Sequence, residues 1–300
     1  GMTTFAIDLI MQVLQKTTQY LSLVKFSHTV FALPFAAIGF TLAISHNGLP
    51  VLWPLAIKVL ICMVTARNAA MAFNRWADRG IDALNPRTAL REIPAGIIKA
   101  NRALWFVIIN ALLFMVTAYL INKLCFYLSP VALFVVLGYS FTKRFTALCH
   151  LVLGAGLALA PVGAYLAVTG SFDIVPILIG IAVLCWVSGF DIIYALQDEK
   201  FDRENKLYSI PSLMGKKQAL QISRILHFLT AGFLALFLYQ AHVGLIAWTG
   251  LAVFYALLIY QHSLVSENNL SKINIAFATT NGIASIVFAG MVITDILLQH

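Results

Sequence analysis

Residues 174–193 read IVPILIGIAVLCWVSGFDII, and this stretch decides the fold class. It carries one charged side chain, Asp191, close to its end. A helix needs about 20 mainly apolar residues to cross the hydrocarbon core of a bilayer, so this stretch is expected to span a membrane. Working outward along the chain, the same criterion predicts nine transmembrane helices, at about 22–45, 51–73, 102–121, 126–142, 148–168, 174–193, 219–240, 243–262 and 273–298.

The composition of the 300 residues agrees with these spans and excludes a soluble globular protein. Hydrophobic residues make up 61% of the chain and charged residues 11%, whereas soluble domains carry roughly 25% charged residues. The mean hydropathy is +0.88. Because so few charged side chains cannot cover a soluble surface, lipid must surround most of the chain. The sequence predicts an all-α integral membrane bundle of nine transmembrane helices around a central cavity.

The charges that are present, with a net of +8, indicate the orientation of this bundle. Lys and Arg collect in two long connections, at about 74–101 and 194–218, and at Lys143-Arg144. Basic connections stay in the cytoplasm. We therefore expect a multi-pass protein of a bacterial inner membrane, with its N-terminus and motif loops cytoplasmic and its C-terminus outside. Residues 1–19 are expected to form an amphipathic segment at the membrane surface, and 20–300 a single transmembrane domain.

The two charged connections resemble each other, which indicates a bundle made of two related halves. An Ile-Pro pair closes each connection. Three polar residues of the first connection also recur 120 positions later in the second. They are Asp78, Asp82 and Asn85, which correspond to Asp198, Asp202 and Asn205.

The carboxylates in these connections are spaced to share helical faces. The first connection contains an NxxxDxxxD pattern, and in the second Asp191 and Tyr194 precede a DxxxD pattern. Residues three or four apart lie on one face of a helix. Clustered carboxylates repel each other without a cation, and Mg²⁺ typically binds one or two carboxylates together with water and phosphate oxygens. We therefore predict a site for Mg²⁺ and a diphosphate, with Asn74, Asp78, Asp82, Asp198 and Asp202 as metal ligands.

Cations near these faces are candidates for contacts with the diphosphate. They are Lys25, Arg67 and Lys143. Arg67 lies inside a predicted span, where an ionisable residue is costly and is by default functional. Other cations close to the membrane are expected to act as topology signals, namely Arg79, Arg102, Lys216, Lys217 and Arg224.

The motifs resemble those of one known family, the UbiA superfamily of membrane prenyltransferases. The similar stretches are the NxxxDxxxD pattern, NPRTALREIPAG at 85–96, DIIYALQDEKFD at 191–202, KFSHTVFALPF at 25–35 and YSFTK at 139–143. The resemblance covers about residues 20–298 and is closest to the bacterial 4-hydroxybenzoate polyprenyltransferases. One departure is Arg75, which stands where the commonest family motif, NDxxDxxxD, has an aspartate.

This resemblance implies a Mg²⁺-dependent transfer of a polyprenyl group from polyprenyl diphosphate to an aromatic acceptor such as 4-hydroxybenzoate, in quinone biosynthesis. Membrane lipid would surround the enzyme. The implied catalytic residues are Asp78, Asp82, Asp198, Asp202 and Asp191, the last of which would support the metal or orient the acceptor. Lys25, Arg67 and Lys143 would bind the diphosphate, with Tyr139 and Tyr194 beside it.

Alternative functions remain open on the sequence. The form NRxxDRxxDxxNPRT also resembles relatives that prenylate a precursor of the futalosine-type menaquinone route, and haem, chlorophyll and a naphthoate are further acceptors within the superfamily. A protein of another class, a secondary transporter, would hold its ion sites near the bilayer midplane. Here the carboxylates cluster at the cytoplasmic ends of the spans, which favours the enzyme. No nucleic-acid partner is expected.

Overall fold

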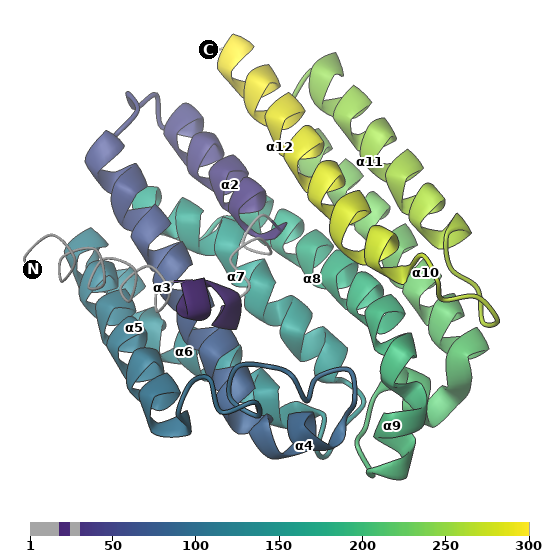
Figure 1. The fold of residues 1–300 in the computed structure, drawn as a ribbon. Helices are drawn as coiled ribbons and strands as arrows, with labels where there is room; N and C mark the ends of the chain where they lie inside the picture. The colour runs from purple at the N-terminus through teal and green to yellow at the C-terminus, as the bar shows by residue number, and fades with distance from the viewer. Residues whose placement is uncertain (1–17, 25–30, 300) are drawn as a thin grey trace, which may run out of the picture.

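Apolar stretches of the chain form long helices that pack side by side in a bundle (Figure 1). The computed structural model describes residues 18–24 and 31–299, and no β-strand forms among these residues. The predicted surface segment at 1–19 lies almost wholly outside them. The long helices are α2 (Leu33–His46), α3 (Trp53–Ala77), α5 (Ala100–Ile121), α6 (Lys123–Thr142), α7 (Cys149–Thr169), α8 (Ile174–Ala195), α10 (Ile210–Gln240), α11 (Leu245–Ser263) and α12 (Asn281–Leu298).

Eight helical segments in the described part of the chain are long and apolar enough to cross a membrane. They contain α3, α5, α6, α7, α8, α10, α11 and α12, the last preceded directly by a short π-helix, η3 (Ile275–Thr280). The membrane bundle is therefore confirmed, and eight of the nine predicted spans are found as full-length helices. The first predicted span differs, because α2 has 14 residues and a length of about 21 Å. Part of that predicted span, 25–30, lies outside the described residues.

Helix α8 is the most buried of the spanning helices and packs against α7 and α10. Its Trp186 is surrounded by Phe35, Phe190 and Phe254, with ring centroids 5.1–5.7 Å away. The indole N–H of Trp186 donates to Asn281 Oδ1 at 3.0 Å, which satisfies its polar atom in the apolar core. Aromatic pairs at such distances contribute beyond the area that they bury. This cluster holds in place the helix that leads into the second motif.

Close contact between α7 and α8 is tightest at one glycine. A Cβ atom on Gly154 would lie 2.5 Å from the carbonyl oxygen of Leu184, a distance that no real side chain allows. The hydroxyl of Ser188 then reaches across the crossing and donates to the carbonyl oxygen of His150 at 3.1 Å. Glycine thus permits the backbones to approach, and a hydrogen bond joins them.

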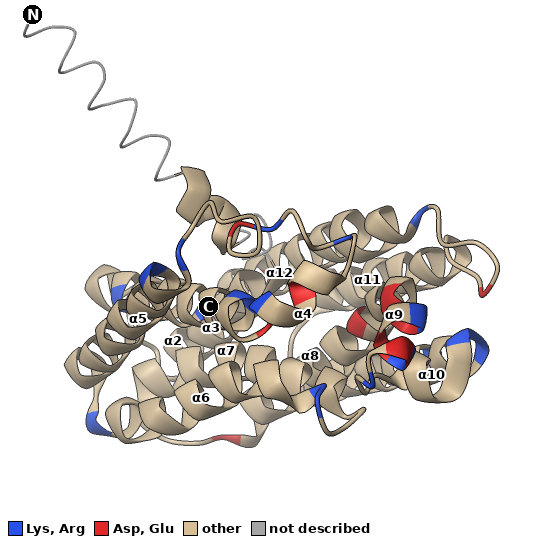
Figure 2. Ribbon diagram, turned by 60° about the horizontal axis from the view of Figure 1, so that its bottom comes forward, with Lys and Arg blue, Asp and Glu red and all other residues tan. Residues whose placement is uncertain are grey.

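Charged residues gather at one end of the bundle, around two short helices, α4 (Arg79–Leu84) and α9 (Glu199–Glu204) (Figure 2). The repeated sequence has a repeated conformation here. Asp78 and Asp198 occupy the N-cap positions of α4 and α9, with φ, ψ of −89°, 2° and −99°, 2°. Asn85 and Asn205 occupy the two C-cap positions. The two motifs therefore begin their short helices in the same way, although the C-cap conformations differ, with ψ of 117° at Asn85 and 12° at Asn205.

The two long connections are more regular than the sequence predicts. The first contains α4, and the second contains a 3₁₀ turn, η2 (Leu196–Asp198), then α9 and the beginning of α10. Helix α10 begins at Ile210 and not at the predicted 219. Its start is fixed by a capping box between Ser209 and Ser212, whose polar residues lower the hydropathy of that turn. Gly215, with φ of 80°, then kinks the helix before its apolar part.

Candidate active site

A polar cavity of about 270 Å³ lies between the two motifs at the charged end of the bundle. Helices α3 and α4 form one wall, and α8, η2 and α9 form the other. All the predicted site residues that the structure describes line this cavity. They are Arg67, Asn74, Asp78, Asp82, Tyr139, Lys143, Asp191, Tyr194, Asp198 and Asp202. Lys25 lies outside the described residues.

Asp78 is nearly buried and is held by two cations from the end of α6. Lys143 Nζ lies 2.9 Å from its Oδ2, and Arg144 Nη2 lies 3.4 Å from its Oδ1. Asn74, one turn earlier on α3, donates to the same carboxylate at 3.3 Å. Asn74 and Asp78 therefore face the cavity together, as their spacing predicts.

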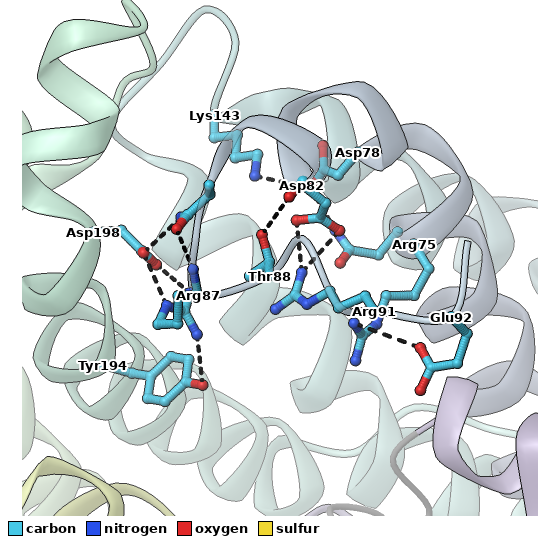
Figure 3. Close-up of polar contacts among 12 residues, drawn as sticks. Arg75, Asp78, Asp82, Arg87, Thr88, Arg91, Glu92, Lys143, Tyr194 and Asp198 are labelled. Carbon is cyan, nitrogen blue, oxygen red and sulfur yellow. Dashed lines mark hydrogen bonds and ion pairs between the residues drawn. The ribbon is translucent and has the colours of Figure 1, made fainter. Parts of the chain in front are cut away.

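Asp82 is paired with a different cation. Nη1 of Arg91 donates to both of its carboxylate oxygens, at 2.8 and 2.9 Å (Figure 3). Thr88 fixes the backbone of the same residue, since its hydroxyl donates to the carbonyl oxygen of Asp82 at 3.0 Å. The loop after α4 thus folds back over the first motif.

Arg75, the departure from the commonest motif, does not face a carboxylate of either motif directly. Its side chain is 4% exposed, and its Nη1 lies 3.9 Å from Oε2 of Glu92 (Figure 3). With Arg91 and Asp82 nearby, this corner of the cavity holds two basic and two acidic side chains. Arg75 therefore places a cation where the commonest motif has a carboxylate, and nearby acidic side chains offset its charge.

Asp198 is bound by residues of the first loop, which joins the two motifs across the cavity. Arg87 donates through Nε to its Oδ1 at 3.0 Å and through Nη2 to its Oδ2 (Figure 3). Asn85 donates to Oδ1 at 3.0 Å, and Arg87 Nη1 donates to the Tyr194 hydroxyl at 3.1 Å. Burial disfavours the charged guanidinium, but the Asp198 carboxylate outweighs it and raises the pKa of Arg87 above its usual value.

The remaining two carboxylates are held by side chains without a fixed positive charge. Oδ2 of Asp202 accepts a hydrogen bond of 2.9 Å from the hydroxyl of Ser209. Oδ2 of Asp191 lies 2.6 Å from Nδ1 of His150 in the first turn of α7. Asp191 lies two helical turns before Asp198, about 10 Å further from the charged end of the bundle.

Arg67 marks the boundary between this polar cavity and an apolar one. The second cavity, of about 320 Å³, lies among α3, α5, α6 and α7 and is lined almost entirely by hydrophobic side chains. Arg67, Tyr139, Leu153 and Leu157 line both cavities, so the two are neighbours through a shared wall. The buried Nε of Arg67 has no hydrogen-bond partner among the described residues, which leaves a donor for a ligand.

Several residues that contact the predicted carboxylates were not predicted from the sequence, among them Asn85, Arg87, Arg91 and His150. Asn85, Arg87 and Arg91 belong to the NPRTALREIPAG stretch, so their sequence signal was visible, but nothing in it indicates which carboxylate each would contact. His150 has no partner nearby in the sequence, and only the crossing of α7 and α8 brings it to Asp191.

The carboxylates around the cavity are ligands of the kind that Mg²⁺ prefers. Among residues 18–24 and 31–299 no three acidic, His or Cys side chains converge on one point. The carboxylates stand instead on two facing walls, with Asp78 and Asp82 on one and Asp198 and Asp202 on the other. Mg²⁺ typically takes one or two carboxylates and completes its octahedron with water and phosphate oxygens, so this arrangement suits it.

Comparison with known proteins identifies the family. The model of the UbiA prenyltransferase family matches residues 32–286, which include both motifs and the helices that carry them. The chain belongs to the UbiA prenyltransferase family. It is therefore a prenyltransferase and a multi-pass membrane protein.

Relatives of this UbiA prenyltransferase cover most of its length. The 4-hydroxybenzoate octaprenyltransferase of Aeromonas salmonicida is 31% identical over 85% of this chain and 87% of its own. That of Tolumonas auensis is 31% identical over 76% of this chain and 79% of its own. Both alignments therefore extend over at least three quarters of each chain.

Solved structures of the UbiA family have the same fold. The apo structure of a UbiA homologue from Aeropyrum pernix is 32% identical, with a TM-score of 0.80 over 89% of this chain and 98% of that chain. A UbiA homologue from Archaeoglobus fulgidus, solved bound to DMAPP and Mg²⁺, is 23% identical, with a TM-score of 0.72 over 93% and 99% of the two chains. The second likeness concerns the fold alone.

Proposed function

We propose that this UbiA prenyltransferase moves a polyprenyl group from a polyprenyl diphosphate to an aromatic acceptor such as 4-hydroxybenzoate, with the help of Mg²⁺. One observation carries the proposal. A polar cavity with carboxylates on two walls adjoins an apolar cavity of similar size inside the bundle. A prenyl diphosphate has the same division, a charged head and a hydrocarbon tail.

Magnesium would be held by Asp78 and Asp82, with Asn74, on one wall and by Asp198 and Asp202 on the other. When bound, Mg²⁺ neutralises the charge that builds up on the diphosphate as its bond to the allylic carbon breaks. The homologue from Archaeoglobus fulgidus, whose structure contains Mg²⁺ with DMAPP, supports this choice of metal.

Cations of the chain would bind the diphosphate oxygens. Lys143 and Arg87 now contact Asp78 and Asp198, and they would be free for phosphate once a metal ion took these carboxylates. Arg67 offers its free Nε from the membrane side, and Lys25 is proposed for the same role. Tyr139 and Tyr194 line the cavity beside these cations.

The hydrocarbon tail would extend from Arg67 into the apolar cavity. The hydrophobic lining of that cavity would keep water away from the allylic carbon. The aromatic ring, and not water, would then react with the carbocation that forms there when the diphosphate leaves. The electron pair of the broken carbon–oxygen bond would leave with the diphosphate. The ring carbon beside the one that carries the phenolic hydroxyl would then form the new carbon–carbon bond. The ring then loses one proton to a base. Asp191 lines the polar cavity about two helical turns before Asp198, and it is proposed to orient the acceptor.

A direct assay tests this function. The purified enzyme in nanodiscs is given Mg²⁺, geranyl diphosphate and a panel of phenolic acceptors, and products are identified by mass spectrometry. We expect a prenylated 4-hydroxybenzoate, and loss of product for Asp78→Ala and Asp198→Ala. Arg79→Ala is the control, because Arg79 is exposed and outside the cavity. Wild-type turnover by both aspartate variants would refute the metal assignment.

The acceptor panel also includes the aromatic precursor of the futalosine-type menaquinone route. The NRxxDRxxDxxNPRT form of the first motif, with Arg75 at its second position, is the reason to include it, because this form resembles relatives that prenylate that precursor. Transfer to that precursor and not to 4-hydroxybenzoate would support the proposed prenyl transfer and would identify a different acceptor.

The charged end of the bundle is proposed to face the bacterial cytoplasm. Both motif loops, the turn between α6 and α7 and the turn between α11 and η3 lie at this end, opposite the turn between α7 and α8 (Figure 1). Alkaline phosphatase fused after Gly170 should be active, and the same reporter fused after Asn205 should be inactive. The reverse pattern would overturn this orientation.

A further inference from the structure

His150 is fixed by a hydrogen bond on each ring nitrogen. Its Nε2 accepts from the backbone N–H of Ile210 at 3.3 Å, and its Nδ1 lies 2.6 Å from Oδ2 of Asp191. Ile210 is the first residue of α10, whose N–H has no partner within the helix. Because Nε2 acts as an acceptor, it carries no proton. The proton of the imidazole therefore sits on Nδ1 and is donated to Asp191.

The fold leaves this pair little freedom to move. The side chain of His150 is 3% exposed. Its own carbonyl oxygen accepts from Ser188 on α8, at the crossing that Gly154 permits. Asp191 lies one turn after Ser188 on the same helix. One turn of α8 therefore contacts His150 twice, at its carbonyl oxygen through Ser188 and at its ring through Asp191. The imidazole thus sets the rotation of the Asp191 carboxylate.

Asp191, like Asp202, has no lysine or arginine partner among the described residues, and it is the carboxylate of the cavity that pairs with a histidine. Asp78, Asp82 and Asp198 each contact a lysine or an arginine. Among the described residues, Asp191 contacts only His150, through Oδ2, and its Oδ1 has no protein partner. Its side chain is 25% exposed, and it lines the cavity. One oriented oxygen is therefore open to a ligand that donates a hydrogen bond.

The position of this oxygen indicates which part of the reaction it serves. Asp191 lies on α8, about 10 Å before Asp198 at the end of η2, away from the charged end. His150, Leu153 and Leu157 follow each other along the cavity side of α7, and the two leucines also line the apolar cavity. A ligand at Asp191 would thus be beside the allylic end of a prenyl chain. A metal ion held by the paired motif carboxylates would be further away.

We propose that the His150–Asp191 pair binds the hydroxyl group of the aromatic acceptor. Asp191 accepts the hydrogen bond of that hydroxyl through Oδ1, and His150 is a positioning residue that orients the carboxylate. The inference rests on the proposed prenyl transfer and adds a specificity determinant to it. A hydrogen bond from the hydroxyl to a carboxylate also raises the electron density of the ring carbon that attacks.

The test compares binding with kinetics. Equilibrium binding of 4-hydroxybenzoate and of 4-methoxybenzoate, which lacks the donated proton, is measured on the enzyme in nanodiscs without prenyl diphosphate. KM values for 4-hydroxybenzoate and geranyl diphosphate and the Mg²⁺ requirement are measured in parallel. The variants are His150→Phe, His150→Gln and Asp191→Asn. His227→Phe is the matched control, because His227 is also a buried, hydrogen-bonded histidine but lies outside the cavity.

Wild type should bind 4-hydroxybenzoate more tightly than 4-methoxybenzoate, and His150→Phe should lose this difference. The KM for 4-hydroxybenzoate should rise roughly 10- to 100-fold, the range for losing a hydrogen bond to a charged group. Values for geranyl diphosphate and Mg²⁺ should stay at those of the control. His150→Gln should restore binding, because its amide can donate to Asp191 and accept from Ile210.

Several results would overturn the inference. Equal binding of the two acids by wild type would do so, as would a defect confined to Mg²⁺ or geranyl diphosphate in Asp191→Asn. If His150→Gln bound 4-hydroxybenzoate as poorly as His150→Phe, the ring of His150 would act only through packing. If His150→Phe fails to fold, Asp191→Asn and His150→Gln decide the outcome. Failure of the proposed function would look different, with no prenylated product from wild type on any acceptor while the binding difference is still measurable.

Discussion

Nε of Arg87 donates to Oδ1 of Asp198 at 3.0 Å and so joins the loop of the first motif to the second motif. Two parallel hydrogen bonds hold this pair, and Tyr194 accepts a third from the same guanidinium. The fork of an arginine fits a carboxylate or a phosphate equally well. Arg87 is thus a cation that can exchange one partner for the other without moving its backbone.

Replacing Arg87 should therefore weaken the handling of the diphosphate. We expect Arg87→Ala to lower kcat/KM for geranyl diphosphate by about 10²- to 10³-fold, as for the loss of one donor to a developing anion. Arg87→Lys should recover little, because an ammonium cannot make two parallel bonds. Steady-state kinetics with varied geranyl diphosphate measure this. Arg79→Ala should stay within about twofold of wild type, and full activity of Arg87→Lys would contradict the role of the fork.

Removing one motif carboxylate should raise the Mg²⁺ requirement. Asp202→Asn keeps the shape of the side chain and its contact with Ser209 but removes a negative charge. The Mg²⁺ concentration for half-maximal activity should rise about tenfold or more, with activity recovering at high Mg²⁺. Titration of metal-depleted enzyme gives the value. Glu204→Gln, an exposed acid on the same short helix, is the matched control, and an equal shift in both variants would point to surface charge alone.

Filling the apolar cavity should shorten the prenyl chain that the enzyme accepts. Ala132 of α6 lines that cavity, and Ala132→Phe places a ring in it. We expect kcat/KM for a long-chain polyprenyl diphosphate to fall about tenfold relative to geranyl diphosphate, given the usual cost of overpacking. Competition between the two donors measures the ratio. Ile109→Phe alters an exposed, lipid-facing position of α5 and should leave the ratio unchanged. An unchanged ratio in Ala132→Phe would exclude this cavity as the tail site.

Asp295 is a buried carboxylate whose role is structural. It accepts from the backbone N–H groups of Gly244 and Ala247 at 2.7 and 2.8 Å and so caps the start of α11. Asp295→Ala should lower stability by about 1–2 kcal/mol without changing kcat per folded molecule. Asp295→Asn should lose less, because one oxygen acceptor remains. Thermal unfolding in detergent micelles measures the loss. Reduced turnover by fully folded Asp295→Ala would argue against a purely structural role.

Much of the fold was predictable because bilayer solvation acts on each stretch of chain separately. The span at 174–193 needed no neighbour to be recognised, and α8 begins at Ile174 as predicted. Boundaries failed where polar residues form helix. The capping box at Ser209 starts α10 in a turn whose hydropathy resembles that of a loop. The shared helical faces of the motifs were predicted, but not the separate six-residue helices α4 and α9 that carry them.

The sequence by itself determined that the chain is a membrane bundle with two matching acidic motifs, since composition and spacing are properties of short stretches. Only the tertiary structure decided which charges meet. Arg87 binds a carboxylate 111 positions away, and His150 binds Asp191 across a helix crossing that Gly154 allows. Such pairs depend on how the helices pack and on where each loop folds back, and neither leaves a periodic signal in the chain. The physical reason is that a segment enters the lipid according to its own polarity. A buried charge, by contrast, pairs with whichever opposite charge the fold brings close to it.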